Sequence, residues 1–100
     1  MPATSPDQPL YAISVAAELT GVQPQVLRDY ENKGLIAPHR TGGGTRRYSQ
    51  SDVDRVHAVT ELLATGVNLA GARRIMELET ELRRLQTELM RFRTRTRSVG

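Results

Sequence analysis

The stretch LRDYENKGLIAPHRTGGGTRRY, residues 27–48, predicts a helix followed by a short β-hairpin. Apolar residues recur at helical spacing from Leu27, and Gly34 supplies the left-handed backbone that often ends a helix. Leu35–Ala37 predicts one strand, Arg46–Tyr48 predicts its return, and the glycines between them belong to the hairpin tip. A helix with an arginine beside an arginine-bearing hairpin can enter a DNA groove and hold the adjacent phosphates. The stretch therefore favours a DNA-binding module.

Another short helix is predicted just before this one. Ser14 can cap a helix that runs through Thr20 and ends at Gly21. Its apolar face is expected to hold Val15, Ala16 and Leu19. Pro24 stands in the first turn of the following helix, where its missing N–H is tolerated. Two short helices this close together predict a helix-turn-helix.

Two more helices are predicted after the hairpin. Ser49 can cap the third helix, and Asp52 can complete a capping box. This helix is expected to run to Gly66 with a buried stripe of Val53, Val56, Val59, Leu62 and Leu63. Asn68 is expected to cap a fourth helix, which carries Leu69, Ala72 and Ile75. No Gly or Pro separates that helix from the C-terminal region, so one continuous long helix is possible.

The C-terminal region has the apolar repeat of a coiled coil, with steps of three and four residues. The repeat consists of Ile75, Leu78, Leu82, Leu85, Leu89 and Phe92. Glu79 and Glu81 flank its start, whereas Arg93 and Arg95 flank its end, so an antiparallel homodimer with its two-fold axis near Thr87 would join opposite charges. A parallel dimer and a helix that folds back onto its own domain remain alternatives.

Length and composition set the domain organisation. A chain of 100 residues allows one small domain, and 38% hydrophobic residues with only four aromatic ones suit a small aliphatic helical core. We expect a disordered tail over residues 1–9, a DNA-binding domain over residues 10–78, and a dimerisation helix with a basic tail over residues 79–100. The net charge is only +3, but the arginines are clustered, which favours a polyanionic partner.

Several classes of function are disfavoured by the sequence. The chain has no cysteine, which excludes disulfides, thiolate zinc sites and cysteine nucleophiles. His39 and His57 lie on different predicted elements and are expected to be exposed, so we predict no metal and no cofactor. The triple glycine lacks the lysine of a phosphate-binding loop, and enzyme activity is not expected. No signal peptide or membrane span is evident, so the expected location is the cytoplasm, on the nucleoid.

The chain resembles the MerR-type regulators over about Tyr11 to Leu78. The matching residues are Val15–Ala17, Leu27, Arg28, Tyr30, Glu31, Gly34–Ile36, Pro38, Arg46–Tyr48 and Asp52. The resemblance implies a mainly α, winged helix-turn-helix fold with a hairpin wing and a C-terminal coiled-coil dimerisation helix. Within the family, Gly42–Gly44 and Gly66–Gly71 look like the HspR heat-shock repressors. That likeness implies a repressor that binds inverted repeats upstream of chaperone genes, with a DnaK-type chaperone as corepressor and no small-molecule effector evident.

The resemblance and the residue chemistry together predict a set of DNA contacts. The predicted DNA-binding residues are Ser14, Gln25, Arg28, Tyr30, Arg40, Arg46, Arg47 and Tyr48. Arg28 is expected to read a base, because its guanidinium can bond guanine through two hydrogen bonds, while the wing arginines and the Tyr30 hydroxyl position phosphates. Asp29 departs from the family pattern, which commonly has tyrosine there.

Other interpretations of these residues remain open. Tyr30 and Tyr48 could instead be core aromatics, and Arg28 could pair with Glu31 or Asp29. At the level of function, the alternatives are a MerR-type regulator of other genes, an excisionase-like protein that bends DNA, and a protein-interaction adaptor. Nothing in these residues decides between activation and repression.

Overall fold

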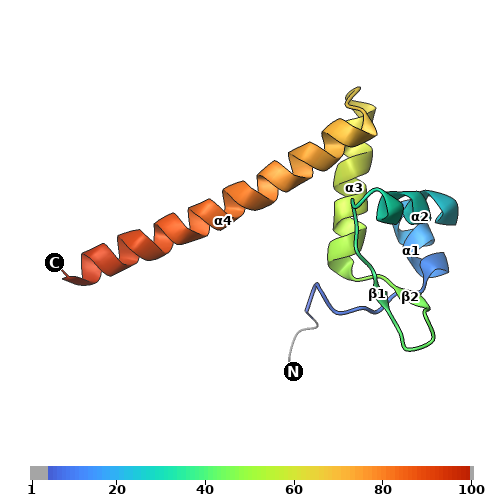
Figure 1. Ribbon diagram of the computed structural model, residues 1–100, viewed down its shortest axis with the longest axis horizontal. Helices are drawn as coiled ribbons and strands as arrows, with labels where there is room; N and C mark the ends of the chain where they lie inside the picture. The colour runs from blue at the N-terminus through green and yellow to red at the C-terminus, as the bar shows by residue number, and fades with distance from the viewer. Residues whose placement is uncertain (1–4, 100) are drawn as a thin grey trace.

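Four helices and a two-stranded hairpin make up the part of the chain described by the computed structural model, which covers residues 5–99 and the side chains through residue 97 (Figure 1). In chain order they are α1 (Ile13–Thr20), α2 (Pro24–Asn32), β1 (His39–Arg40), β2 (Arg46–Arg47), α3 (Gln50–Ala64) and α4 (Leu69–Val99). The first two helices and the hairpin lie beside α3, whereas α4 runs away from them as a long rod (Figure 1). The predicted order of helix-turn-helix, hairpin and long C-terminal helix is confirmed.

The core lies between α1, α2, α3 and the first turns of α4. Its largest fully buried side chains are Tyr48, Leu27, Leu35, Val56 and Val59. Ala72 and Met76 of α4 are also buried and complete the cluster, so the beginning of the long helix belongs to this domain. Each buried aliphatic side chain of this size contributes about 1.5–3 kcal/mol of hydrophobic stabilisation.

The turn between α1 and α2 was predicted correctly, but the cap and the buried face of α1 were not. Gly21 ends α1 with a φ of 75°, and its N–H donates to the carbonyl of Ala17. Ser14 lies inside the helix, where Ala12 is the N-cap residue and makes no side-chain capping bond. The buried residues of α1 are Ala16 and Thr20. Because both side chains are small, the helix can pack closely against the rest of the domain. The predicted apolar face is therefore wrong in part, because Val15 and Leu19 are exposed.

The hairpin begins later than the sequence predicts. Leu35 and Ile36 are buried in the core without forming a strand, so the predicted strand at residues 35–37 is wrong. The pairing starts beyond Pro38, which lacks an N–H to donate. His39 lies opposite Arg47, and Arg40 lies opposite Arg46. The turn follows the prediction: the N–H of Thr41 donates to Thr45, and Gly44 has a φ of 82°.

The N-terminal end of α3 holds the preceding chain as well as its own cap. The predicted capping box is present: the N–H of Asp52 donates to Ser49 Oγ at 3.0 Å, and the N–H of Ser49 donates to Asp52 Oδ2 at 2.9 Å. Ser51 donates its N–H to the carbonyl of Pro6 and its hydroxyl to Asp7. Residues 6 and 7 are therefore bonded to the start of α3, while residues 1–4 of the predicted tail lie outside the described residues, and the disorder of the tail stays a prediction.

The fourth helix is continuous from Leu69 to Val99. Asn68 caps it as predicted, because its side-chain oxygen accepts from the N–H of Gly71 at 2.8 Å. After Met76 the described side chains of this helix are exposed, so the alternative in which the helix folds back onto its own domain is wrong. Across the described part of the chain, no helix is both long and apolar enough to cross a membrane.

Candidate nucleic-acid interface

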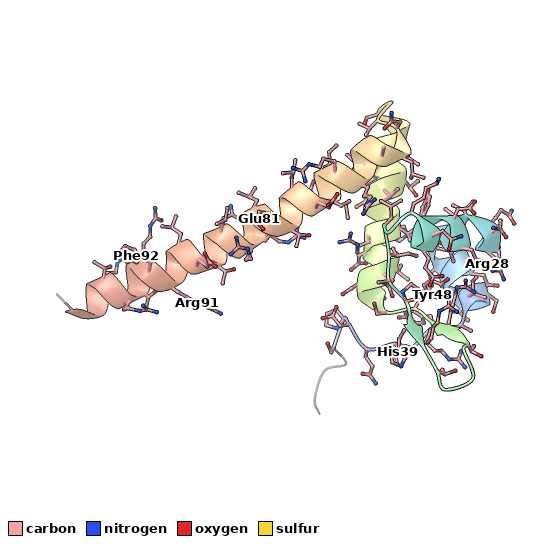
Figure 2. All side chains as sticks on the ribbon, viewed as in Figure 1. Arg28, His39, Tyr48, Glu81, Arg91 and Phe92 are labelled. Atoms are coloured by element: carbon pink, nitrogen blue, oxygen red, sulfur yellow. The ribbon has the colours of Figure 1, made fainter. Side chains whose placement is uncertain are left out.

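The second helix of the helix-turn-helix buries one face and presents polar side chains on another. Leu27 and Tyr30 point into the core. Gln25 and Asp29 are exposed, and Arg28 is partly exposed between them. Residues three and four positions apart share a helix face, so these three side chains form one surface. Figure 2 shows Arg28 on the side of the domain away from α4.

Arg28 does not form the ion pair that the sequence left open. Asp29 accepts a hydrogen bond from Gln25 Nε2 at 3.1 Å, and Glu31 is occupied by arginines of the hairpin. Within residues 5–97, the Arg28 guanidinium has no hydrogen bond or ion pair, whereas each neighbouring acid has another partner. Its five N–H donors are thus available to a ligand outside the chain.

Two arginines of the hairpin converge on Glu31 at the end of α2. Arg40 of β1 lies 3.0 Å from one carboxylate oxygen, and Arg46 of β2 donates Nε–H to the other. Arg40 also donates Nη1–H to the carbonyl of Gly44, at 3.1 Å. The bond to Glu31 raises the pKa of Arg46 further above its ordinary value, so Arg46 stays charged. The predicted wing thus carries two cations fixed against the predicted recognition helix.

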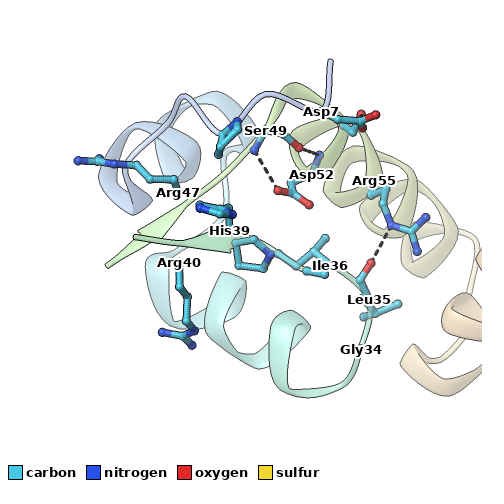
Figure 3. Close-up of a pocket in the computed structure, with 14 residues that line it drawn as sticks. Asp7, Gly34, Leu35, Ile36, His39, Arg40, Arg47, Ser49, Asp52 and Arg55 are labelled. Carbon is cyan, nitrogen blue, oxygen red and sulfur yellow. Dashed lines mark hydrogen bonds between the residues drawn. The ribbon is translucent and has the colours of Figure 1, made fainter. Parts of the chain in front are cut away.

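Arg47 lies on the other face of the hairpin. Because it neighbours Arg46 along a strand and pairs with His39, it points away from the Glu31 side. Figure 3 shows Arg47 and Arg40 leaving the hairpin in different directions, with His39 beside Arg47. No ion pair or hydrogen bond engages the Arg47 side chain among residues 5–97. His39 is exposed, as predicted, and so is His57, whose Nε2 lies 3.2 Å from the carbonyl of Leu19.

The two tyrosines of the predicted site are core residues. Tyr48 is 1% exposed, so the predicted DNA contact of its side chain is wrong (Figure 2). Tyr30 is 7% exposed. Burial raises the pKa of both phenols above the ordinary value of 10. The prediction that the Tyr30 hydroxyl holds a phosphate is therefore also wrong, and the core alternative that the sequence left open is confirmed for both.

Ser14 and Gln25 occupy surface positions that a ligand can reach. Ser14 is exposed in the first turn of α1, and Gln25 is exposed in the first turn of α2. Helix N-terminal ends favour anions, because their backbone N–H groups carry partial positive charge. Sequence reasoning missed the role of Glu31, because only the folded hairpin brings Arg40 and Arg46 beside it. The sequence shows that Glu31 and Arg46 carry opposite charges. Because the two residues lie far apart along the chain, no sequence pattern predicts that they form an ion pair.

Beyond Ile75, the predicted coiled-coil stripe has no partner among residues 5–97. Ile75 is partly buried beside the domain. The other five stripe residues are 47–65% exposed and are Leu78, Leu82, Leu85, Leu89 and Phe92. Arg84 forms ion pairs with Glu81 and Glu88 along the helix, and its proximity lowers the pKa of Glu81. A row of large apolar side chains this exposed on one helix is typical of an association surface.

Comparison with known proteins identifies the family. The family described as "MerR HTH family regulatory protein" matches residues 11–79 of the chain, which confirms the resemblance seen over Tyr11 to Leu78. The chain is 49% identical, over 80% of its length, to a protein of Streptomyces coelicolor that carries the name heat shock protein HspR, and it spans 54% of that protein. It is 31% identical to the HTH-type transcriptional regulator GlnR of Bacillus anthracis, covering 92% of this chain and 68% of GlnR.

A solved structure agrees with these relatives. The crystal structure of HiNmlR, a MerR family regulator lacking the sensor domain, is bound to promoter DNA. The match covers 89% of this chain and 69% of the HiNmlR chain, with a TM-score of 0.66 and 27% sequence identity. The present chain spans about half the length of the HspR relative. Its fold, and its sequence over residues 11–79, show that the chain belongs to the MerR HTH family of regulatory proteins.

Proposed function

We propose that the chain is a homodimeric, sequence-specific DNA-binding transcriptional regulator that represses heat-shock or chaperone genes from an inverted repeat. The proposal is carried by the surface that joins α2 to the hairpin. There Arg28 has no partner among residues 5–97, and a set of arginines lies on the adjoining wing. A free guanidinium on a helix can read guanine in the major groove, while wing cations bind the flanking phosphates. The DNA-bound HiNmlR structure supports this use of the fold.

The proposed DNA contacts differ from those expected from the sequence. Arg28 remains the base-reading residue, and Arg47, whose side chain has no hydrogen bond or ion pair among residues 5–97, becomes the wing residue proposed to hold a phosphate. Arg40 and Arg46 contribute through the N–H groups that Glu31 leaves unused. Ser14 and Gln25 would add neutral contacts to phosphate or base edges.

The exposed stripe of α4 supports a dimer. Five large apolar side chains from Leu78 to Phe92 would be covered by a second copy of the same helix. Among residues 5–97, Glu79, Arg93 and Arg95 form no ion pair within their own helix. In an antiparallel pair Glu79 would face Arg93 of the partner subunit, so the free charges complement one another in this orientation. A two-fold dimer in turn fits a DNA site made of two inverted halves.

The heat-shock assignment rests on the relative from Streptomyces coelicolor. Its name is the reason to place this chain among regulators of stress genes rather than, for example, with GlnR. By the same likeness, we propose a DnaK-type chaperone as a corepressor and the nucleoid as the place of action.

The decisive experiment is the genome-wide selection of DNA fragments by the purified protein at near-physiological salt. We expect an inverted repeat upstream of chaperone genes, and we expect Arg28→Ala to lose it. Arg91→Ala is the matched control, because it removes the same charge from an exposed position of α4 that lies far from the domain (Figure 2). A repeat upstream of other genes would keep the regulator and discard the heat-shock role.

The salt dependence of binding separates this proposal from its alternatives. A dimer that contacts about eight phosphates has a slope of log affinity against log salt near about −7. An adaptor would show a slope less than about half as steep. An excisionase-like protein would bind and bend DNA without requiring the inverted repeat, so the selection experiment would enrich no two-fold site.

A further inference from the structure

Glu31 connects three elements through one carboxylate. It stands in the last turn of α2, and its side chain is 17% exposed. One oxygen accepts from Arg40 of β1, and the other accepts from Arg46 of β2. These two arginines are cross-strand partners, so they project from the same face of the hairpin. Both strands of the wing are therefore tied to the helix that carries Arg28.

The same contacts reduce the charge that the wing offers to DNA. Two guanidinium charges face one carboxylate, which leaves a net charge of about +1 where Arg40 and Arg46 alone would present +2. These contacts do not use all the hydrogen-bond donors of Arg40 and Arg46, since each guanidinium has five N–H groups. Arg46 uses Nε–H, and Arg40 uses one N–H on each of Nη1 and Nη2. Both arginines can still donate to a phosphate, but only from the place where Glu31 holds them.

We propose that Glu31 is a positioning residue for DNA recognition: it fixes Arg40 and Arg46 beside Arg28 and restrains their binding to duplexes that lack the operator. This inference rests on the proposed function. A phosphate at the correct distance from the bases read by Arg28 meets both guanidiniums without rearrangement. Elsewhere on DNA the wing cannot follow the backbone freely, because its two strands are tied to the helix. Glu31 thus lowers the affinity for duplexes that lack the operator and thereby raises the selectivity for the operator.

The test compares Glu31→Gln with wild-type protein on two duplexes of equal length and composition. One duplex carries the repeat selected from the genome, and the other carries its scrambled sequence. We expect the substitution to tighten binding to the scrambled duplex and to lower the ratio of operator to scrambled affinity by about tenfold, comparable with one lost base-pair contact. The salt slope on the scrambled duplex should steepen by up to about 0.9 for each arginine released.

Asp29→Asn is the matched control. It removes the same charge from the same helix, but Asp29 is exposed, and among residues 5–97 its carboxylate bonds Gln25 and not the hairpin. General electrostatics predicts the same small gain for both variants, whereas the positioning role predicts loss of selectivity only for Glu31→Gln. In a second comparison, made in an Arg46→Gln background, Glu31→Gln should have a smaller effect, because one of its two partners is already absent.

The outcomes are distinguishable. Equal ratios for Glu31→Gln and Asp29→Asn would overturn the positioning role while leaving the proposed function intact. Weaker binding of Glu31→Gln to both duplexes at an unchanged salt slope would show a structural role only, and circular dichroism would confirm whether the fold is altered. If wild-type protein selects no sequence and Arg28→Ala changes nothing, the proposed function fails, and the role of Glu31 fails with it.

Discussion

Tyr30 and Tyr48 are both buried. Among residues 5–97, the Tyr48 hydroxyl lies in the core without a hydrogen-bond partner. An unsatisfied buried hydroxyl costs about 1–3 kcal/mol. We expect Tyr48→Phe to raise the free energy of unfolding by about 1 kcal/mol. Tyr30→Phe should not raise it, because the Tyr30 hydroxyl is not among the buried polar atoms without a partner. Urea unfolding followed by circular dichroism measures both, and a clear loss in Tyr48→Phe would contradict the prediction.

The same two phenols predict how stability depends on alkaline pH. Burial raises the pKa of each above 10 in the folded protein, so the folded state keeps its protons where the unfolded state loses them. Their stabilising contribution is complete below about pH 10, the unfolded value, and is lost as the pH rises toward the folded pKa. We expect the melting temperature to fall as the pH rises above about 10, more steeply for wild type than for Tyr48→Phe. Equal slopes would exclude Tyr48 as a source.

Individual residues of the candidate interface were only partly predictable. The sequence pointed to Arg28, and the structure places it partly exposed, with no hydrogen bond or ion pair of its side chain among residues 5–97. The tyrosines could not be assigned, because a phenol is both apolar enough for the core and polar enough for a phosphate. Glu31 was considered only as a partner for Arg28, which lies three residues away, since the contact with Arg46 depends on how the hairpin folds back.

Among the helices, α3 is the one whose start depends most clearly on capping by neighbouring residues. The Ser49 hydroxyl accepts the N–H of Asp52 and is buried with it, so replacing Ser49 with alanine leaves that N–H without its acceptor, while the N–H of residue 49 can still donate to the Asp52 carboxylate. We expect Ser49→Ala to lower the free energy of unfolding by about 1 kcal/mol, possible values being about 0.5–2. Ser14→Ala is the matched control, because Ser14 lies in an exposed helical turn and caps nothing. Similar losses in both variants, measured by thermal unfolding, would show that the capping box has no special weight.

Helix ends marked by capping residues could be predicted from the sequence, whereas segments whose structure depends on tertiary packing could not. Gly21, Ser49 and Asn68 marked helix ends correctly, because each works through bonds to residues at most four positions away. The strand assigned to residues 35–37 failed for the opposite reason. Leu35 and Ile36 are apolar because they fill the core between helices, and a short apolar run reads the same way in a strand.

At the scale of the whole molecule, two parts are joined by one helix. The first turns of α4 complete the core of the DNA-binding domain, and the remainder extends away with its apolar stripe exposed (Figure 1). A rigid connection of this kind would fix the distance between two recognition helices in a dimer. That distance sets the spacing of the half-sites in an inverted repeat. Association through α4 and selectivity for DNA are therefore expected to be lost together.

Engineered cysteines can determine the orientation of the proposed dimer, because the natural sequence contains none. In the antiparallel arrangement Leu82 faces Phe92 of the partner subunit, so a chain with Leu82→Cys and Phe92→Cys should form disulfide-linked dimers under mild oxidation. The single variant Leu82→Cys should not, since the two copies of residue 82 would lie about 15 Å apart along the axis at a rise of about 1.5 Å per residue. A disulfide needs Cα atoms within about 7 Å. Efficient cross-linking of the single variant on a non-reducing gel would establish a parallel dimer instead. Monomers for both variants, with wild type also monomeric in sedimentation equilibrium, would exclude the dimer.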